Sequence, residues 1–105
     1  MATLLLVGER QDEELALEHL LQLKGFSVRL LNESKDLLKV LSSGGINAVG
    51  MDMNMPDLDG CEATNLVKAD AALGIIPIIL GEPHPATSDE ERARSSGADG
   101  FLQSQ

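Results

Sequence analysis

The sequence lacks the residues on which several functions depend. It contains no tryptophan or tyrosine, and only two of its 105 residues are phenylalanine. Proteins that bind single-stranded nucleic acid stack the bases on aromatic side chains, so the composition disfavours this class. Eight basic residues against 17 acidic ones give a formal charge of −9, and an acidic surface repels phosphate backbones. We therefore predict no nucleic-acid partner; a cation or a basic protein suits this charge better.

Cysteine and long apolar runs are also scarce. Cys61 is the single cysteine, which excludes an internal disulfide and a zinc site built from cysteines. No apolar run approaches the length of a membrane span, and no signal peptide is visible. Hydrophobic residues make up 43 % of the chain, which is enough for one folded core. The expectation is a single cytoplasmic domain over residues 1–105 without membrane contact.

Strand-like and helix-like patterns alternate along the whole chain. Short apolar runs indicate buried strands, and apolar residues three or four positions apart indicate one face of a helix. Helices are predicted at about 11–24, from 32 or 34 to about 41, and at about 61–72 and 88–97. Strands are predicted at 4–7, 26–30, 46–52 and 75–80, and from 101 onward. This order predicts a parallel sheet with helices on both faces. The apolar face of the first helix consists of Leu15, Ala16, Leu20 and Leu23.

One carboxylate stands out because it ends a predicted strand. Asp52 follows the apolar run 46–51 and begins a segment that contains Pro56 and Gly60. Open α/β sheets bind their ligands at the carboxyl ends of the strands, so Asp52 is the candidate functional residue. Asp57 and Asp59 are interpreted as turn formers.

The segment 52–60 (DMNMPDLDG) resembles the phosphoacceptor loop of bacterial response regulator receiver domains, most closely the chemotaxis type. Residues 76–79 (IPII) are similar to the fourth strand of that family, and residues 97–102 (GADGFL) to the approach to its fifth strand. The resemblance covers the whole chain. It implies a flavodoxin-like three-layer α/β sandwich with a five-stranded parallel sheet of order 2-1-3-4-5. Receivers usually continue into a fifth helix, which we expect to be absent here.

The resemblance also implies a site. Asp52 matches the aspartate that accepts a phosphoryl group from a histidine kinase or a phosphotransfer protein, so it would act as a nucleophile. Magnesium would be held by Glu9, Asp52 and the backbone carbonyl of Asn54, because this ion prefers oxygen ligands. Receivers carry two acids after the first strand, where this chain has Gly8 and Glu9. We therefore expect weakened or absent Mg²⁺ binding.

Two further positions depart from the family. Glu82 stands where receivers have a serine or threonine that hydrogen-bonds the phosphoryl group, and its charge would repel that group. Ser104 stands where receivers have a lysine that pairs with the phosphate. Loss of such a donor or charge lowers the rate of phosphoryl transfer by orders of magnitude. Glu82 could also face a metal together with Glu9 and Asp52, although a solvent-facing role is favoured.

Two functions stay open. The chain is either a phosphorylatable receiver with a degenerate switch or a pseudo-receiver, which is a protein-interaction module that works without phosphate. An enzyme is disfavoured, because no Gly-rich phosphate loop follows the first strand and no nucleophile elbow is present. Without a fifth helix, a stripe over residues 4–7 and the last strands would be exposed. This face could bind an output protein or domain, or a second copy of the chain.

Overall fold

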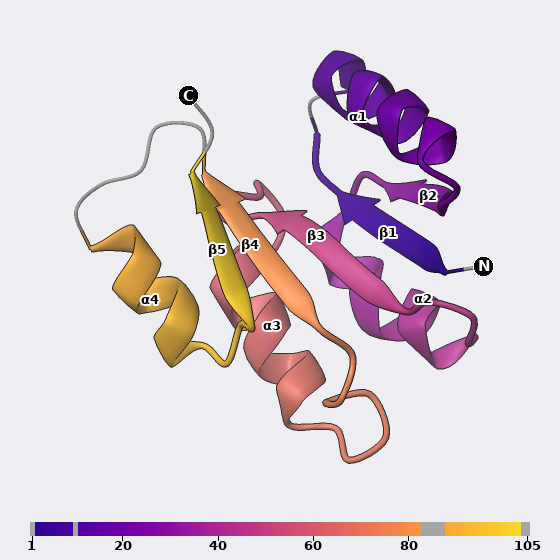
Figure 1. The fold of residues 1–105 in the computed structure, drawn as a ribbon. Coiled ribbons are helices and arrows are strands. Elements are labelled where there is room, and N and C mark those ends of the chain that lie inside the picture. The colour runs from indigo at the N-terminus through magenta and orange to yellow at the C-terminus, as the bar shows by residue number, and fades with distance from the viewer. Residues whose placement is uncertain (1, 10, 83–87, 104–105) are drawn as a thin grey trace.

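The computed structural model describes residues 2–9, 11–82 and 88–103 (Figure 1). The strands are β1 (Thr3–Val7), β2 (Ser27–Leu31), β3 (Ala48–Asp52), β4 (Ile78–Glu82) and β5 (Gly100–Gln103). The helices are α1 (Gln11–Leu23), the 3-10 helix η1 (Ser34–Asp36), α2 (Leu37–Ser42), α3 (Gly60–Lys68) and α4 (Asp89–Ser95). None of the helices in these described ranges is long and apolar enough to cross a membrane.

The five strands form one parallel sheet in the order β2-β1-β3-β4-β5, which confirms the predicted topology. β3 lies at the centre of this sheet, so its residues pair with β1 on one side and β4 on the other. All carboxyl ends of the strands meet at one edge because every pairing is parallel. The sheet therefore brings the ends of β1, β3 and β4 to a common edge.

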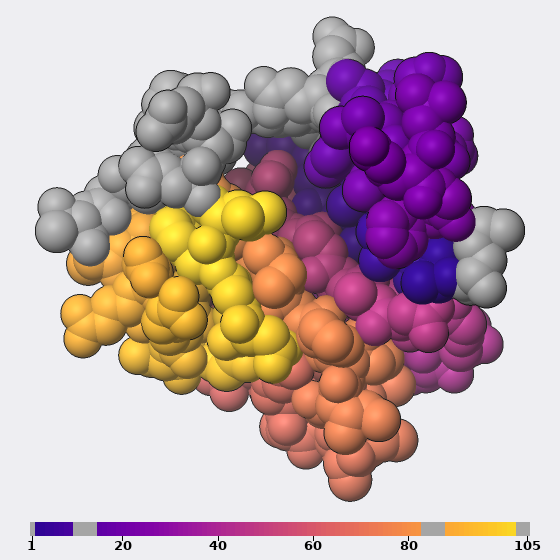
Figure 2. Space-filling view, viewed as in Figure 1, coloured from indigo at the N-terminus to yellow at the C-terminus, as the bar shows by residue number. Residues whose placement is uncertain are grey.

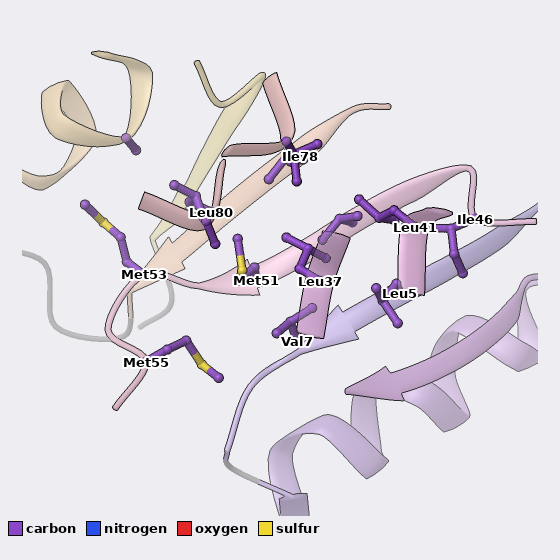
Figure 3. Packing of buried hydrophobic residues seen from close by; sticks show 14 residues of the cluster. Leu5, Val7, Leu37, Leu41, Ile46, Met51, Met53, Met55, Ile78 and Leu80 are labelled. Atoms are coloured by element: carbon purple, nitrogen blue, oxygen red, sulfur yellow. The ribbon is translucent and has the colours of Figure 1, made fainter. Parts of the chain in front are cut away.

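The helices divide into two layers. Figure 3 shows the core between the sheet and the helices α2, α3 and α4, where alternate strand residues such as Val49, Ile78 and Leu80 are at most 1 % exposed. Three methionines at and after the end of β3 (Met51, Met53 and Met55) are buried in the same core. The other face of the sheet carries α1. The predicted three-layer sandwich is confirmed, with one helix forming the second outer layer among the described residues.

The predicted apolar face of α1 is not buried. Leu15, Leu20 and Leu23 are 51 %, 51 % and 72 % exposed, and Leu102 on β5 is 67 % exposed. Figure 2 shows α1 and β5 separated by sheet surface that no described helix covers. The predicted stripe over residues 4–7 is wrong in detail, since residues 5–7 are buried and only Leu4 is half-buried. The exposed apolar side chains lie instead on α1 and β5, and also at Leu66 of α3 and at Ile75 before β4.

Two predicted boundaries are wrong by three or more residues, and other boundaries differ by one or two. The helix α3 ends at Lys68 rather than near residue 72, because the Asp70 carboxylate accepts hydrogen bonds from the N–H groups of Ala72 (2.9 Å) and Leu73 (3.0 Å). A side chain that binds nearby backbone N–H groups competes with helix continuation. β4 begins at Ile78 rather than at residue 75, after a proline that has no N–H to donate.

Lys68, the last residue of α3, connects this helix to the segments that precede β4 and β5. Its Nζ donates to the carbonyl oxygens of Gly74 (3.0 Å) and Ile76 (2.9 Å) and to the carboxylate of Asp99 (2.8 Å). The same Asp99 carboxylate accepts a 2.8 Å hydrogen bond from the N–H of Ile78, the first residue of β4. The hydrogen bond from Lys68 lowers the pKa of Asp99 below its ordinary 3.8, and the one from Ile78 adds to this, while burial opposes it.

Candidate functional site

Asp52 is the last residue of the central strand β3 and is half-buried at the carboxyl edge of the sheet. It pairs in register with Gly81 of β4. The chain beyond it stays attached to β4, because the N–H of Met53 donates to the carbonyl of Gly81 at 2.9 Å. The pairing with β4 therefore fixes the backbone at Asp52, whereas the pairing of β3 with β1 ends at Met51.

The amino end of α3 packs directly on this strand end. Gly60, the first residue of α3, donates its N–H to the carbonyl of Met53 at 2.8 Å. A Cβ atom at Gly60 would lie 2.6 Å from the carbonyl oxygen of Asp52 and 3.0 Å from the Cα of Met53. Both contacts are with backbone, so only glycine allows this approach. The loop from Asp52 to Gly60, called the acceptor loop below, is therefore held closely at its two ends.

Asp57 attaches the middle of the acceptor loop to η1. Its carboxylate accepts hydrogen bonds from the hydroxyl of Ser34 (3.0 Å) and the N–H of Lys35 (2.9 Å), and the Ser34 hydroxyl also contacts the carbonyl of Leu58. Partial burial raises the pKa of Asp57, but the hydrogen bonds from Lys35 and Ser34 outweigh it, so the pKa is lowered. Asp57 is thus more than a turn former, because it connects segments 22 to 23 residues apart.

Asp59 caps α3. Its carboxylate accepts a 2.8 Å hydrogen bond from the N–H of Cys61, and it lies 3.6 Å from a guanidinium nitrogen of Arg92 on α4. The sequence carries a signal for the cap, since Asp59 and Glu62 have the spacing of a capping box. The contact with Arg92 spans two elements far apart in the sequence, and no local pattern predicts it.

Cys61 sits beside this ion pair, in a groove of about 410 Å³ between α3 and α4. The groove is lined by Cys61, Glu62, Asn65, Ser88, Glu91, Arg92, Ser95 and Ser96. Burial raises the pKa of the Cys61 thiol and the charge of Asp59 raises it further, while the charge of Arg92 opposes the change. The thiol is therefore a packed group with less thiolate character than a free cysteine.

The second strand end of the site carries Glu82, the last residue of β4. Its carboxylate accepts a hydrogen bond from the side-chain amide of Asn54, on the acceptor loop. Glu82 is half-buried, and Asn54 is exposed. The structure thus brings together two of the predicted site residues, and the carboxylate at the end of β4 is engaged with the acceptor loop.

Gly8 and Glu9, the predicted site residues after β1, lie at the same edge. Gly8 follows β1, is buried, and donates its N–H to the carbonyl of Leu31 at 3.0 Å, whereas the next residue, Glu9, is exposed. Ser104 lies outside the described residues. Within the described ranges, no three side chains from histidine, cysteine, aspartate and glutamate lie close enough to hold a metal ion. The predicted magnesium ligands are only two carboxylates, from Glu9 and Asp52, together with the backbone carbonyl of Asn54. Magnesium binding by these three ligands stays a prediction.

The doubly wound sheet, with an aspartate ending its central strand, defines an α/β domain of the receiver type. The family model of the response regulator receiver domain matches residues 4–104, and the chain belongs to this family. The CAI-1 autoinducer sensor kinase/phosphatase CqsS of Vibrio cholerae is 31 % identical over 102 residues. That match covers 94 % of this chain, which spans 15 % of the length of CqsS.

Solved receiver structures share the fold. The chemotaxis response regulator CheY4 of Vibrio cholerae superposes with a TM-score of 0.88 at 22 % identity, covering 98 % of this chain and 86 % of that one. The receiver domain of the sensor histidine kinase PA1611 from Pseudomonas aeruginosa gives 0.86 at 24 % identity, covering 97 % and 84 %. That structure has a magnesium ion coordinated in its active-site cleft. These likenesses establish the fold of the present chain as that of two-component receivers.

Proposed function

We propose that this domain is a phosphoryl-accepting receiver of two-component signalling with Asp52 as the acceptor and a degenerate switch. The observation that carries the proposal is the half-buried Asp52 at the carboxyl end of the central strand, in a chain of the receiver family. The likeness to a sensor kinase/phosphatase supports a histidine kinase or a phosphotransfer protein as the donor. We propose an output protein as the recipient of the signal. In this role the domain is a signalling module and not an enzyme.

The chemistry is nucleophilic displacement at phosphorus. A carboxylate oxygen of Asp52 forms a bond to the phosphorus atom of a phosphohistidine, the N–P bond breaks, and the imidazole leaves and takes up a proton. Carboxylate and carbonyl oxygens suit magnesium, so Glu9, Asp52 and the backbone carbonyl of Asn54 would hold the ion, which neutralises phosphoryl charge when bound. With one carboxylate besides the acceptor, we propose that this binding is weak.

The switch is degenerate because three of its positions are substituted. Gly8 removes one acid of the metal site, and Ser104 removes the fixed positive charge. Glu82 has the largest expected effect, because its carboxylate lies at the end of the strand paired with the acceptor strand. Two negative charges about 4 Å apart repel by about 4 kcal/mol at an effective dielectric of 20. This repulsion opposes the addition of a phosphoryl group, so we expect Asp52 to be phosphorylated slowly.

The second candidate is a pseudo-receiver that acts by binding proteins without phosphate. Glu82 favours this candidate, because its carboxylate already accepts a hydrogen bond from Asn54 of the acceptor loop without any phosphoryl group. The exposed leucines of α1 and β5 favour it as well, since exposed apolar patches mark protein interfaces. A second copy of the chain could bind this face and form a homodimer.

Intact mass spectrometry after incubation with acetyl phosphate and Mg²⁺ separates the two candidates. The receiver proposal expects one phosphoryl group on the wild-type chain and none on Asp52→Asn, which keeps the size of the side chain but removes the nucleophile. An ordinary receiver run in parallel is the positive control. Absence of label on the wild type, under conditions that label the control, would refute the receiver proposal and favour the interaction module.

A further inference from the structure

Helix α4 makes few apolar contacts with the rest of the domain. Ala93 is the one apolar residue of this helix and is fully buried, while Glu90, Glu91 and Arg94 are exposed. The groove of about 410 Å³ separates α4 from α3, so side chains do not fill the space between the two helices. Polar contacts therefore contribute a large share of what positions α4.

Arg92 provides such a contact across the groove. One of its guanidinium nitrogens lies 3.6 Å from the carboxylate of Asp59, and another lies 3.2 Å from Asp89, the buried first residue of α4. Cys61 lies in the same place, because its N–H donates to Asp59 and its side chain lines the groove together with Arg92. Arg92 thus bridges the start of α4 and the start of α3.

The bridge continues to Asp52 through short backbone contacts. Asp59 caps α3 at the N–H of Cys61, and the neighbouring Gly60 donates its N–H to the carbonyl of Met53, the residue after Asp52. Gly60 has no free space on the side of the strand, because a methyl group there would overlap the Asp52 carbonyl. A displacement of the acceptor loop therefore has to move Asp59, which moves the partner of Arg92.

We propose that Arg92 is a positioning residue that couples helix α4 to the acceptor loop through Asp59. This route passes through neither position 82 nor position 104, which are two of the three substituted switch positions. The coupling is a property of the unmodified protein, so it stands or falls separately from the phosphorylation of Asp52. Because coupling free energies are reciprocal, a change made in the loop must alter α4, and a change made in α4 must alter the loop.

Amide hydrogen exchange followed by NMR tests this reciprocity. Asp59→Asn keeps a good helix cap but removes the charge that attracts Arg92. We expect it to raise the exchange rates of the α4 amides at positions 92–96 by about two- to fivefold, the range for a half-exposed ion pair. Arg92→Gln should raise exchange at Gly60 and Cys61 by a similar factor, and the double variant should change little more than either single one.

Arg94→Gln is the matched control, because Arg94 pairs with Glu90 on its own helix and not with the loop. It should leave Gly60 and Cys61 at wild-type rates. In 1 M NaCl the Debye length falls to about 3 Å. The changes in exchange rate, on α4 in Asp59→Asn and at Gly60 and Cys61 in Arg92→Gln, should then disappear. The proposal is overturned if Asp59→Asn leaves the α4 amides at wild-type rates, or if Arg94→Gln changes the loop as much as Arg92→Gln does.

Discussion

Replacing Gly60 with alanine places a methyl group where the backbone of the acceptor strand already lies. The added Cβ would be 2.6 Å from the carbonyl oxygen of Asp52 and 3.0 Å from both the Cα and the carbonyl oxygen of Met53. Real Cβ atoms rarely approach other atoms so closely, and none of these atoms belongs to a flexible side chain. Either α3 or the end of β3 must shift, and both are fixed by the 2.8 Å hydrogen bond between Gly60 and Met53.

The cost follows from two opposing effects. Adding a methyl group to a closely packed position destabilises a protein by about 1–3 kcal/mol. Alanine has a higher helix propensity than glycine by at most about 1 kcal/mol, and this gain is smaller in the first turn of a helix. The packing effect wins, so we expect the free energy of unfolding to fall by about 1–2 kcal/mol.

Urea unfolding followed by circular dichroism measures this loss, because the chain has no tryptophan to report by fluorescence. With an m value of about 1–3 kcal/mol per molar urea, the midpoint should fall by about 1 M at unchanged m. Gly81→Ala is the matched control: it pairs with Asp52, but its Cβ would meet its nearest atom at an ordinary 3.5 Å. A wild-type midpoint for Gly60→Ala would show that the close approach of α3 is misjudged.

Two further predictions concern charge. Asp99→Asn should cost about 1 kcal/mol at pH 7, since its half-exposed carboxylate pairs with Lys68. The pKa of Asp99 is lowered in the folded state, so this contribution is present above about pH 4 and is lost as the pH falls through the lowered value. Urea titrations from pH 7 to pH 2.5 should show the cost vanish, and a constant cost would contradict the assignment. Asp59→Asn should lower the pKa of the Cys61 thiol, seen as a lower inflection in the pH dependence of alkylation, whereas an unchanged inflection would contradict the contact.

The fold was predictable because local pattern and topology agree. Alternating apolar runs and helical spacing identify five strands and four helices, and parallel connections leave few possible sheet orders. Boundaries were less predictable, because single side chains decide them. The carboxylate of Asp70 accepts hydrogen bonds from the N–H groups of Ala72 and Leu73, which would otherwise continue the helix α3. The spacing of apolar residues does not reveal this competition.

Burial on α1 was not predictable, since a helical pattern shows that a face is apolar but not what covers it. Leu23 has the helical spacing expected of a buried residue on α1, yet its side chain is 72 % exposed. The candidate site likewise contains one residue that local pattern predicts and contacts that it does not. Asp52 can be located from strand position alone, whereas the contacts of Glu82 with Asn54 and of Arg92 with Asp59 join segments that are 28 and 33 residues apart.

We propose that Asp52 is a phosphoryl acceptor and that the carboxylate of Glu82 opposes its reaction. The most direct test is the initial rate at which acetyl phosphate and Mg²⁺ label Asp52 in the wild type and in Glu82→Thr, which restores a hydroxyl. Each 1.4 kcal/mol of repulsion removed in the transition state is worth about a factor of ten in rate. We predict labelling at least about tenfold faster in Glu82→Thr, and none when Asp52 is replaced by asparagine in either background. Equal rates in the two proteins would show that the carboxylate of Glu82 does not oppose phosphorylation of Asp52.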